Sequence, residues 1–145
     1  MNFIVREAVA SDAEAIYRLN CDEMGYVFPI EATKTNIKGL LNKSSHKIYV
    51  AVIEDLVVGY IHADDYDLIY ANPMKNIMGI AVSSKYKNNG IGRALIQQVE
   101  QWAYQTGSHG VRIVSGMDRT DAHAFYHKCG YSEDKKQLNL KKTIK

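Results

Sequence analysis

Apolar positions along the chain follow two different periods, and the changes between them predict the order of the elements. Continuous or β-rich apolar runs indicate strands, whereas apolar spacings of three and four indicate helices. Strands are predicted over residues 2–9, 47–53, 56–63, 77–82, 111–115 and 138–141. Helices are predicted between Ser11 and Gly25 and over residues 31–42, 91–106 and 122–129. This order predicts an α/β fold with a mixed sheet.

Local signals refine three of these elements. Ser11 and Glu14 have the spacing of a capping box, with Ser11 as the N-cap of the first helix. Glu54-Asp55 joins two strands as a hairpin turn. The run 77–82 is apolar throughout, which predicts a strand buried on both faces, and the polar stretch 64–76 before it is expected to be a loop.

Composition is that of one soluble globular domain spanning residues 1–145. The chain has 46% apolar and 23% charged residues, a formal charge of +2 and only two cysteines. Such a small charge argues against a dedicated nucleic-acid binder, and the cysteines suit a reducing compartment. No apolar run approaches the roughly 18 residues of a membrane span, and the first residues do not resemble a signal peptide. We therefore expect a cytoplasmic protein with no membrane or nucleic-acid partner.

Charge is unevenly distributed along the chain. Five lysines lie in the last eleven residues, whereas stretches 19–33 and 48–74 contain acidic residues but no Lys or Arg. Basic residues in the middle of the chain gather at Lys85, Lys87 and Arg93. For any single stretch, ordinary solvated surface is the simpler interpretation.

A glycine-containing loop between a predicted strand and a long helix carries the clearest chemical signal. Gly90 and Gly92 open the helix, and Lys87 and Arg93 flank them. Glycines allow close backbone approach, and the amides at a helix start bind anions, so a phosphorylated cofactor is the natural occupant. The alternative is a plain strand-to-helix turn. Leu95 occupies the sixth position of a dinucleotide fingerprint, and Gly92-Arg93-Ala94 does not match a P-loop, so both nucleotide motifs fail.

Two segments together resemble the GNAT superfamily of acetyl-CoA-dependent N-acetyltransferases. Residues 87–92, Lys-Asn-Asn-Gly-Ile-Gly, are similar to its Arg/Gln-x-x-Gly-x-Gly/Ala loop, with lysine at the first position. Residues 122–131 match its Ala-x-x-Phe-Tyr-x-x-x-Gly-Phe/Tyr segment. The resemblance covers nearly the whole chain. It implies a mainly antiparallel twisted sheet with flanking helices, a central strand–loop–helix cofactor site, and acetyl-CoA as co-substrate.

The resemblance also implies which residues hold coenzyme A. The backbone of the strand before the loop would bind the pantetheine arm and thioester, and the loop amides would bind the diphosphate. Arg119 stands where the family often has an asparagine that contacts coenzyme A. The implied cofactor-binding residues are Ile80, Ala81, Val82, Lys87, Asn88, Asn89, Gly90, Ile91, Gly92, Arg93 and Arg119.

The chemistry requires one acid and one base. An amine attacks the thioester carbonyl and a thiolate departs, so backbone donors aimed at the carbonyl oxygen and a proton donor for the thiolate both assist. Tyr126 matches the family's tyrosine acid, and a tyrosine that packs beside Phe125 is the alternative. His123 lies on the same helix and is open to a site role or a structural one.

The base is not identified by the resemblance. Two branches of the family use a glutamate, and the matching positions hold Asn76 and Val114. His62, Asp64, Asp65 or water are the remaining candidates. His123 and His127 have a metal-ligand spacing but no third ligand, so no metal is predicted.

These observations predict an enzyme that acetylates a primary amine. The two stretches without Lys or Arg lie where this family walls the acceptor, which favours a cationic small molecule. A protein or peptide N-acetyltransferase and a non-catalytic acyl-CoA sensor remain as alternatives. A homodimer also remains open.

Overall fold

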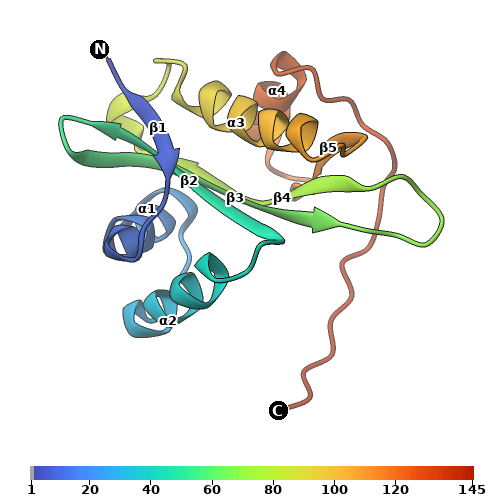
Figure 1. Ribbon diagram of the computed structural model, residues 1–145, viewed down its shortest axis with the longest axis horizontal. Helices are drawn as coiled ribbons and strands as arrows, with labels where there is room; N and C mark the ends of the chain where they lie inside the picture. The colour runs from blue at the N-terminus through green and yellow to red at the C-terminus, as the bar shows by residue number, and fades with distance from the viewer. Residues whose placement is uncertain (1) are drawn as a thin grey trace. The chain divides into compact units, whose positions relative to one another are not determined.

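The computed structural model describes residues 2–145, which form a five-stranded sheet and four helices (Figure 1). The strands are β1 Ile4–Glu7, β2 His46–Ile53, β3 Leu56–Tyr66, β4 Met74–Val82 and β5 Gly110–Ile113. The helices are α1 Ala13–Met24, α2 Ile30–Leu41, α3 Ile91–Gln105 and α4 Thr120–Lys128, with short 3-10 turns at Ala10–Asp12 and Ser84–Tyr86. The chain divides into two compact units, of which the first ends at Val114 and the second is Ser115–Lys145.

The sheet lies in the first unit and has the order β1-β2-β3-β4-β5. The first three pairs of neighbours are antiparallel, and β4 and β5 are parallel. The predicted mixed, mainly antiparallel sheet is therefore confirmed. Glu54 and Asp55 both have a positive φ, which suits the two-residue turn of a right-twisted hairpin.

Helices cover both faces of this sheet, with α1 and α2 on one side and α3 on the other (Figure 1). The side of Gly59 faces α3, because a Cβ there would meet Ile91 and Leu95. The next residue, Tyr60, faces the opposite side and donates a hydrogen bond to Asn20 of α1. Alternation along a strand thus separates an α3 face from an α1–α2 face. The largest fully buried side chains are Ile61, Ile91, Leu95, Ile96, Val50, Val58 and Val99.

The start of α1 differs from the prediction. Ser11 lies in a 3-10 turn, and the N-cap of α1 is Asp12. The buried Asp12 carboxylate accepts a hydrogen bond from the Val9 amide at 2.8 Å and two from the Arg6 guanidinium at 2.8 and 3.0 Å. The predicted capping box at Ser11 was wrong, because the Asp12 carboxylate binds the Val9 amide and fixes a 3-10 turn before the helix begins.

Strands β3 and β4 extend into the stretch predicted as a loop, because its polar residues pair across the strands. Only residues 67–73 lie outside the ladder. The predicted burial of 77–82 on both faces is wrong at Met78, which is 56% exposed.

The predicted strand 138–141 is absent. Leu138 and Leu140 are 84% and 83% exposed, and no residue after α4 is in a helix or strand. Alternation predicts a strand only where a partner edge is available, and the described residues of the second unit contain none. None of the helices among residues 2–145 is long and apolar enough to span a membrane.

A buried ion pair joins β3 to β4 on the α3 face. The Lys75 ammonium binds the Asp65 carboxylate and lies 4.2 Å from the centre of the Trp102 ring of α3. Lys75 is only 4% exposed, whereas the Asp65 side chain is 34% exposed. The Lys75 ammonium therefore needs the Asp65 counter-charge, whereas the more exposed carboxylate can be solvated by water.

We expect Asp65→Asn to lower the free energy of unfolding by about 3–5 kcal/mol, because it leaves a buried ammonium without a counter-charge. Lys75→Met should cost less than half as much, since the Asp65 carboxylate can hydrate. Urea denaturation followed by circular dichroism measures both, with Asp67→Asn as the exposed control. Equal losses for the two variants would contradict this asymmetry.

Candidate active site

Strands β4 and β5 pair along only part of their length. The parallel pairs run from Met74–Gly110 to Ile77–Ile113, and β4 then continues to Val82. Beyond Ile77, β4 therefore has a backbone edge with no strand beside it among residues 2–145. We call the Gly79–Val82 part of this edge the open edge.

Hydrogen bonding to β3 shows which groups face the open edge. The Ser83 amide donates to the Val58 carbonyl at 2.8 Å, and the same antiparallel register continues to His62 opposite Gly79. Hydrogen-bonded pairs alternate with non-bonded pairs in such a ladder. Gly79 and Ala81 therefore bond to β3, whereas Ile80 and Val82 direct their N–H and C=O groups to the open edge.

Of the three strand residues expected to bind coenzyme A, two thus have the required backbone orientation. Ala81 has its backbone groups turned to β3 and its methyl group buried in the core on the α1–α2 face. Ala81 thus packs in the core through its side chain, and its contact with coenzyme A stays a prediction.

A bulge lies at the start of the open edge. His62 pairs with Gly79 and Ala63 with Ile77, so Met78 is an extra residue in β4. Bulges re-aim backbone and side chains and are frequent beside active sites. This one accounts for the exposure of Met78.

The glycine loop follows β4 directly and leads into α3. Gly90 has a φ of 80° and is the N-cap of α3, and Asn88 also has a positive φ. The first helical bond runs from the Ala94 amide to the Gly90 carbonyl at 3.0 Å. The amides of Ile91 and Gly92 precede that bond, which is the arrangement of a helix-start anion site.

Side chains hold this loop at both ends. Asn89 donates to the Tyr86 carbonyl at 3.0 Å, and the Ser84 amide donates to the Glu23 carboxylate of α1 at 3.0 Å. Lys85, Lys87 and Arg93 are exposed around it. The chain thus brings the predicted residues Ile80–Arg93 together as strand, loop and helix start, with Ile91 available through its backbone because its side chain is buried.

The remaining predicted residues lie in the second unit. Arg119 is the N-cap of α4, and Tyr126 lies within α4 and is 7% exposed. His123 forms a hydrogen bond of 2.8 Å with the Gly116 carbonyl, which favours the structural interpretation of this histidine. No group of three potential metal ligands exists among the described residues.

The three side chains considered as the base lie on two faces of β3. Asp65 is on the α3 face, where it is bound to Lys75, so it is poorly suited to accept a proton from substrate. His62 and Asp64 lie on the α1–α2 face. Among the side chains, the fold therefore leaves His62 and Asp64 as the candidates for the base.

That face carries a polar row that the sequence analysis missed. His46, Asp64, Asn76 and Arg112 occupy directly opposed positions on four successive strands. The Arg112 guanidinium donates to Asn76 Oδ1 at 2.8 Å, and Asn76 Nδ2 is 3.3 Å from Asp64 Oδ1. The row crosses the sheet one residue before β4 and β5 separate.

Two histidines meet beside this row. His46 Nδ1 and His62 Nε2 are 2.9 Å apart, and the rings are stacked with centroids 5.2 Å apart. Burial, followed by the effect of His46, lowers the pKa of His62 to about 4, although Asp64 opposes the change. His62 is therefore a neutral imidazole near pH 7.

Tyr60 lies between these histidines and α1. Burial raises the pKa of its phenol to about 12, so it remains protonated and donates to Asn20 Oδ1 at 2.6 Å. Its hydroxyl is 3.2 Å from where a Cβ of Gly79 would lie. The absence of a side chain at Gly79 therefore leaves this hydroxyl next to the β4 backbone at the open edge.

The acidic stretches do not form one continuous surface. Glu54 and Asp55 lie at the opposite end of β3 from Asp64, and Glu23 is bound to the loop. The other acidic residues of these stretches include Asp22, Glu31, Asp64 and Asp67, of which Glu31 lies 3.7 Å from the Lys34 ammonium.

Comparison with known proteins gives a consistent result. A model of the acetyltransferase (GNAT) family matches residues 13–131. Aminoalkylphosphonate N-acetyltransferase of Salmonella typhimurium is 25% identical over 130 residues, which cover 89% of this chain and 84% of that protein. Aminoglycoside N(6')-acetyltransferase type 1 of Acinetobacter baumannii is 32% identical over 73 residues, only half of each chain.

Solved structures show the same fold. Aminoglycoside 6'-N-acetyltransferase AAC(6')-Ih of Acinetobacter baumannii superposes with a TM-score of 0.86 at 20% identity, covering 99% of this chain and all of that one. AAC(6')-Iy in complex with a bisubstrate analogue, CoA-S-monomethyl-acetylneamine, has a TM-score of 0.88 at 16% identity and the same coverage.

The lowered pKa of His62 predicts a pH dependence of stability. Between pH 6.5 and 4 the unfolded chain binds a proton at this histidine and the folded chain does not, so stability falls as the pH is lowered through this range. The loss from this group amounts to about 3 kcal/mol. Urea titrations at a series of pH values should show it, and His62→Gln should remove it. Parallel pH curves for the two proteins would be inconsistent with a buried neutral His62.

Proposed function

The chain belongs to the acetyltransferase (GNAT) family, and we propose that it transfers the acetyl group of acetyl-CoA to a primary amine of a small molecule. The family match runs through both compact units, which supports one acetyltransferase domain over residues 1–145. Relatives that act on small amines support the acceptor class.

The open edge of β4 is the observation that carries this proposal. Ile80 and Val82 offer backbone N–H and C=O groups in the alternation that an extended amide chain needs for pairing. The pantetheine arm of coenzyme A carries such amides. The amides of Ile91 and Gly92, with Lys87 and Arg93 nearby, suit its diphosphate. The residues present therefore fit coenzyme A, which supplies an acetyl group activated as a thioester.

The chain's own groups then have distinct tasks. An N–H group at the open edge stabilises negative charge on the thioester carbonyl oxygen, an interaction that strengthens as the amine attacks. Tyr126 donates a proton to the departing thiolate, since a phenol and a thiol have similar acidities, about 10 and about 8.5. The motif in residues 122–131 is the basis for this assignment, and Arg119 is assigned to coenzyme A on the same basis.

A cationic acceptor is supported by Asp22, Glu31, Asp64 and Asp67 and by the aminoglycoside-acetylating relatives. Arg112 favours a second candidate, an amine that also carries an anionic group. Its guanidinium is stacked 4.1 Å from the centre of the Tyr66 ring and makes one side-chain hydrogen bond, to Asn76. The aminoalkylphosphonate-acetylating relative supports this candidate.

A direct assay should measure thiol release from acetyl-CoA with an aminoglycoside, spermidine, aminoethylphosphonate, a neutral primary amine and a lysine peptide. We expect release with at least one small amine and none with the peptide. Tyr126→Phe should lower kcat by about 10²–10⁴-fold without weakening coenzyme binding. Tyr104→Phe, which alters an exposed phenol of α3, is the matched control.

The outcomes separate the alternatives. Tight coenzyme A binding without release for any amine would favour an acyl-CoA sensor, and peptide turnover would favour a protein acetyltransferase. Release that is unchanged in Tyr126→Phe would remove the acid assignment. A preference for aminoethylphosphonate over spermidine would favour the Arg112 candidate over the cationic one.

A further inference from the structure

The paired histidines of β2 and β3 connect the face beside the open edge to a cavity at the sheet's margin. His62 lies opposite Gly79, the first residue of the open edge, where β4 has no side chain and the Tyr60 hydroxyl lies beside the backbone. Its Nε2 is 2.9 Å from His46 Nδ1. His46, in turn, lines a cavity of about 290 Å³.

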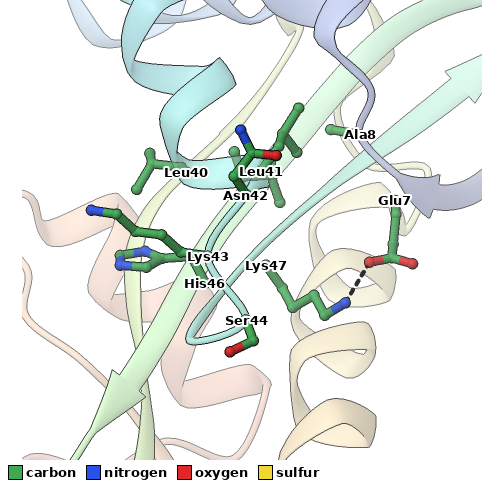
Figure 2. A pocket seen from close by; sticks show the side chains of 10 residues that line it. Glu7, Ala8, Leu40, Leu41, Asn42, Lys43, Ser44, His46 and Lys47 are labelled. Carbon is green, nitrogen blue, oxygen red and sulfur yellow. Dashed lines mark hydrogen bonds and ion pairs between the residues drawn. The ribbon is translucent and has the colours of Figure 1, made fainter.

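This cavity lies between the end of α2 and the adjoining ends of β1 and β2, and apolar residues such as Leu40 and Leu41 line it beside polar ones. Glu7, Lys43, Ser44 and Lys47 line it together with His46. Figure 2 shows the His46 ring beside Lys43, and the Lys47 ammonium directed to Glu7, with which it forms an ion pair of 2.7 Å. Because Lys43 and Ser44 are exposed, the cavity is in contact with solvent.

We propose that His62 accepts the proton that the attacking amine loses and that His46 passes a proton on to solvent through this cavity. This inference rests on the proposed function, because acetyl transfer to an ammonium requires the loss of a proton before attack. His62 is then a catalytic residue, and His46 is a positioning residue that acts through it.

The proton balance follows from the contact between the two rings. With Nε2–H of His62 donated to His46 Nδ1, the Nδ1 lone pair of His62 is the vacant acceptor. His62 Nδ1 takes the amine proton, Nε2–H passes to His46 Nδ1, and His46 Nε2–H leaves to water in the cavity. No net charge stays on the pair. After the product leaves, each ring returns to its starting tautomer by exchange with water, losing its Nδ1 proton and gaining one on Nε2.

The groups around His62 favour passing the proton on to His46 over holding it on His62 as an imidazolium. His62 faces His46 from β2, Asp64 and Tyr60 from its own strand, and Asn76 and Arg112 through the polar row. Asn20 of α1 is held by Tyr60, and Glu7, Lys43 and Lys47 surround the cavity end. The burial that keeps His62 neutral also prevents it from trapping the proton.

The test compares His62→Gln, His46→Gln and the double variant, with the acceptor that the wild-type protein uses. We expect His62→Gln to lower kcat by about 10²–10⁴-fold, the range for a lost general base. His46→Gln should lose part of that factor, and the double variant should be no slower than His62→Gln. KM for acetyl-CoA should stay unchanged in all three.

The pH profile separates a proton path from a structural role. If hydroxide replaces the relay, the defect of both single variants should shrink by up to about tenfold for each unit of rising pH. His109→Gln, which alters an exposed histidine outside the pair, should keep wild-type rates and slope. Retained binding of acetyl-CoA shows that a variant is folded. If His62→Gln does not fold, His62→Asn takes its place in the test.

Each result decides a different claim. Losses that multiply in the double variant, or variants whose profiles run parallel to that of the wild type, would overturn the relay. If the wild type turns over and His62→Gln equals it, the relay alone fails. If the wild type releases no thiol with any amine, the proposed function fails and the relay fails with it.

Discussion

Strand β4 keeps β5 as a hydrogen-bonding neighbour only as far as Ile77, yet it runs on to Val82. Backbone N–H and C=O groups need hydrogen-bond partners. Beyond Ile77, the groups of Ile80 and Val82 that point away from β3 have no strand to pair with. The glycine loop follows at once and begins α3 with further amides. The proposed site for the extended, phosphorylated amide chain of coenzyme A therefore lies where the sheet stops pairing.

The two faces of the sheet then serve different purposes. On the α3 face, the polar groups of Asp65 and Lys75 neutralise one another beneath Trp102 and stabilise the strands. On the α1–α2 face, the polar row and the two histidines are only partly covered. A residue's place in the alternation of β3 therefore decides whether its charge is structural or available for chemistry.

Much of this fold was predictable from periodicity, since the apolar runs of β2, β3 and α3 and the turn at Glu54–Asp55 each carry a local signal. The glycine loop at the start of α3 was predictable because its glycines and lysine lie within six residues. His46 and Arg112 were not, because their place beside Asp64 and Asn76 depends on the register of four strands. The bulge at Met78 and the missing strand at 138–141 also depend on partners that no local pattern reveals.

Amide hydrogen exchange of β4, resolved residue by residue by NMR, tests the central claim that the open edge receives coenzyme A. Adding acetyl-CoA should slow exchange of the Ile80 and Val82 amides, whereas those of Gly79 and Ala81, already bonded to β3, should change little. Unchanged exchange at Ile80 and Val82 in a protein saturated with acetyl-CoA would contradict the account.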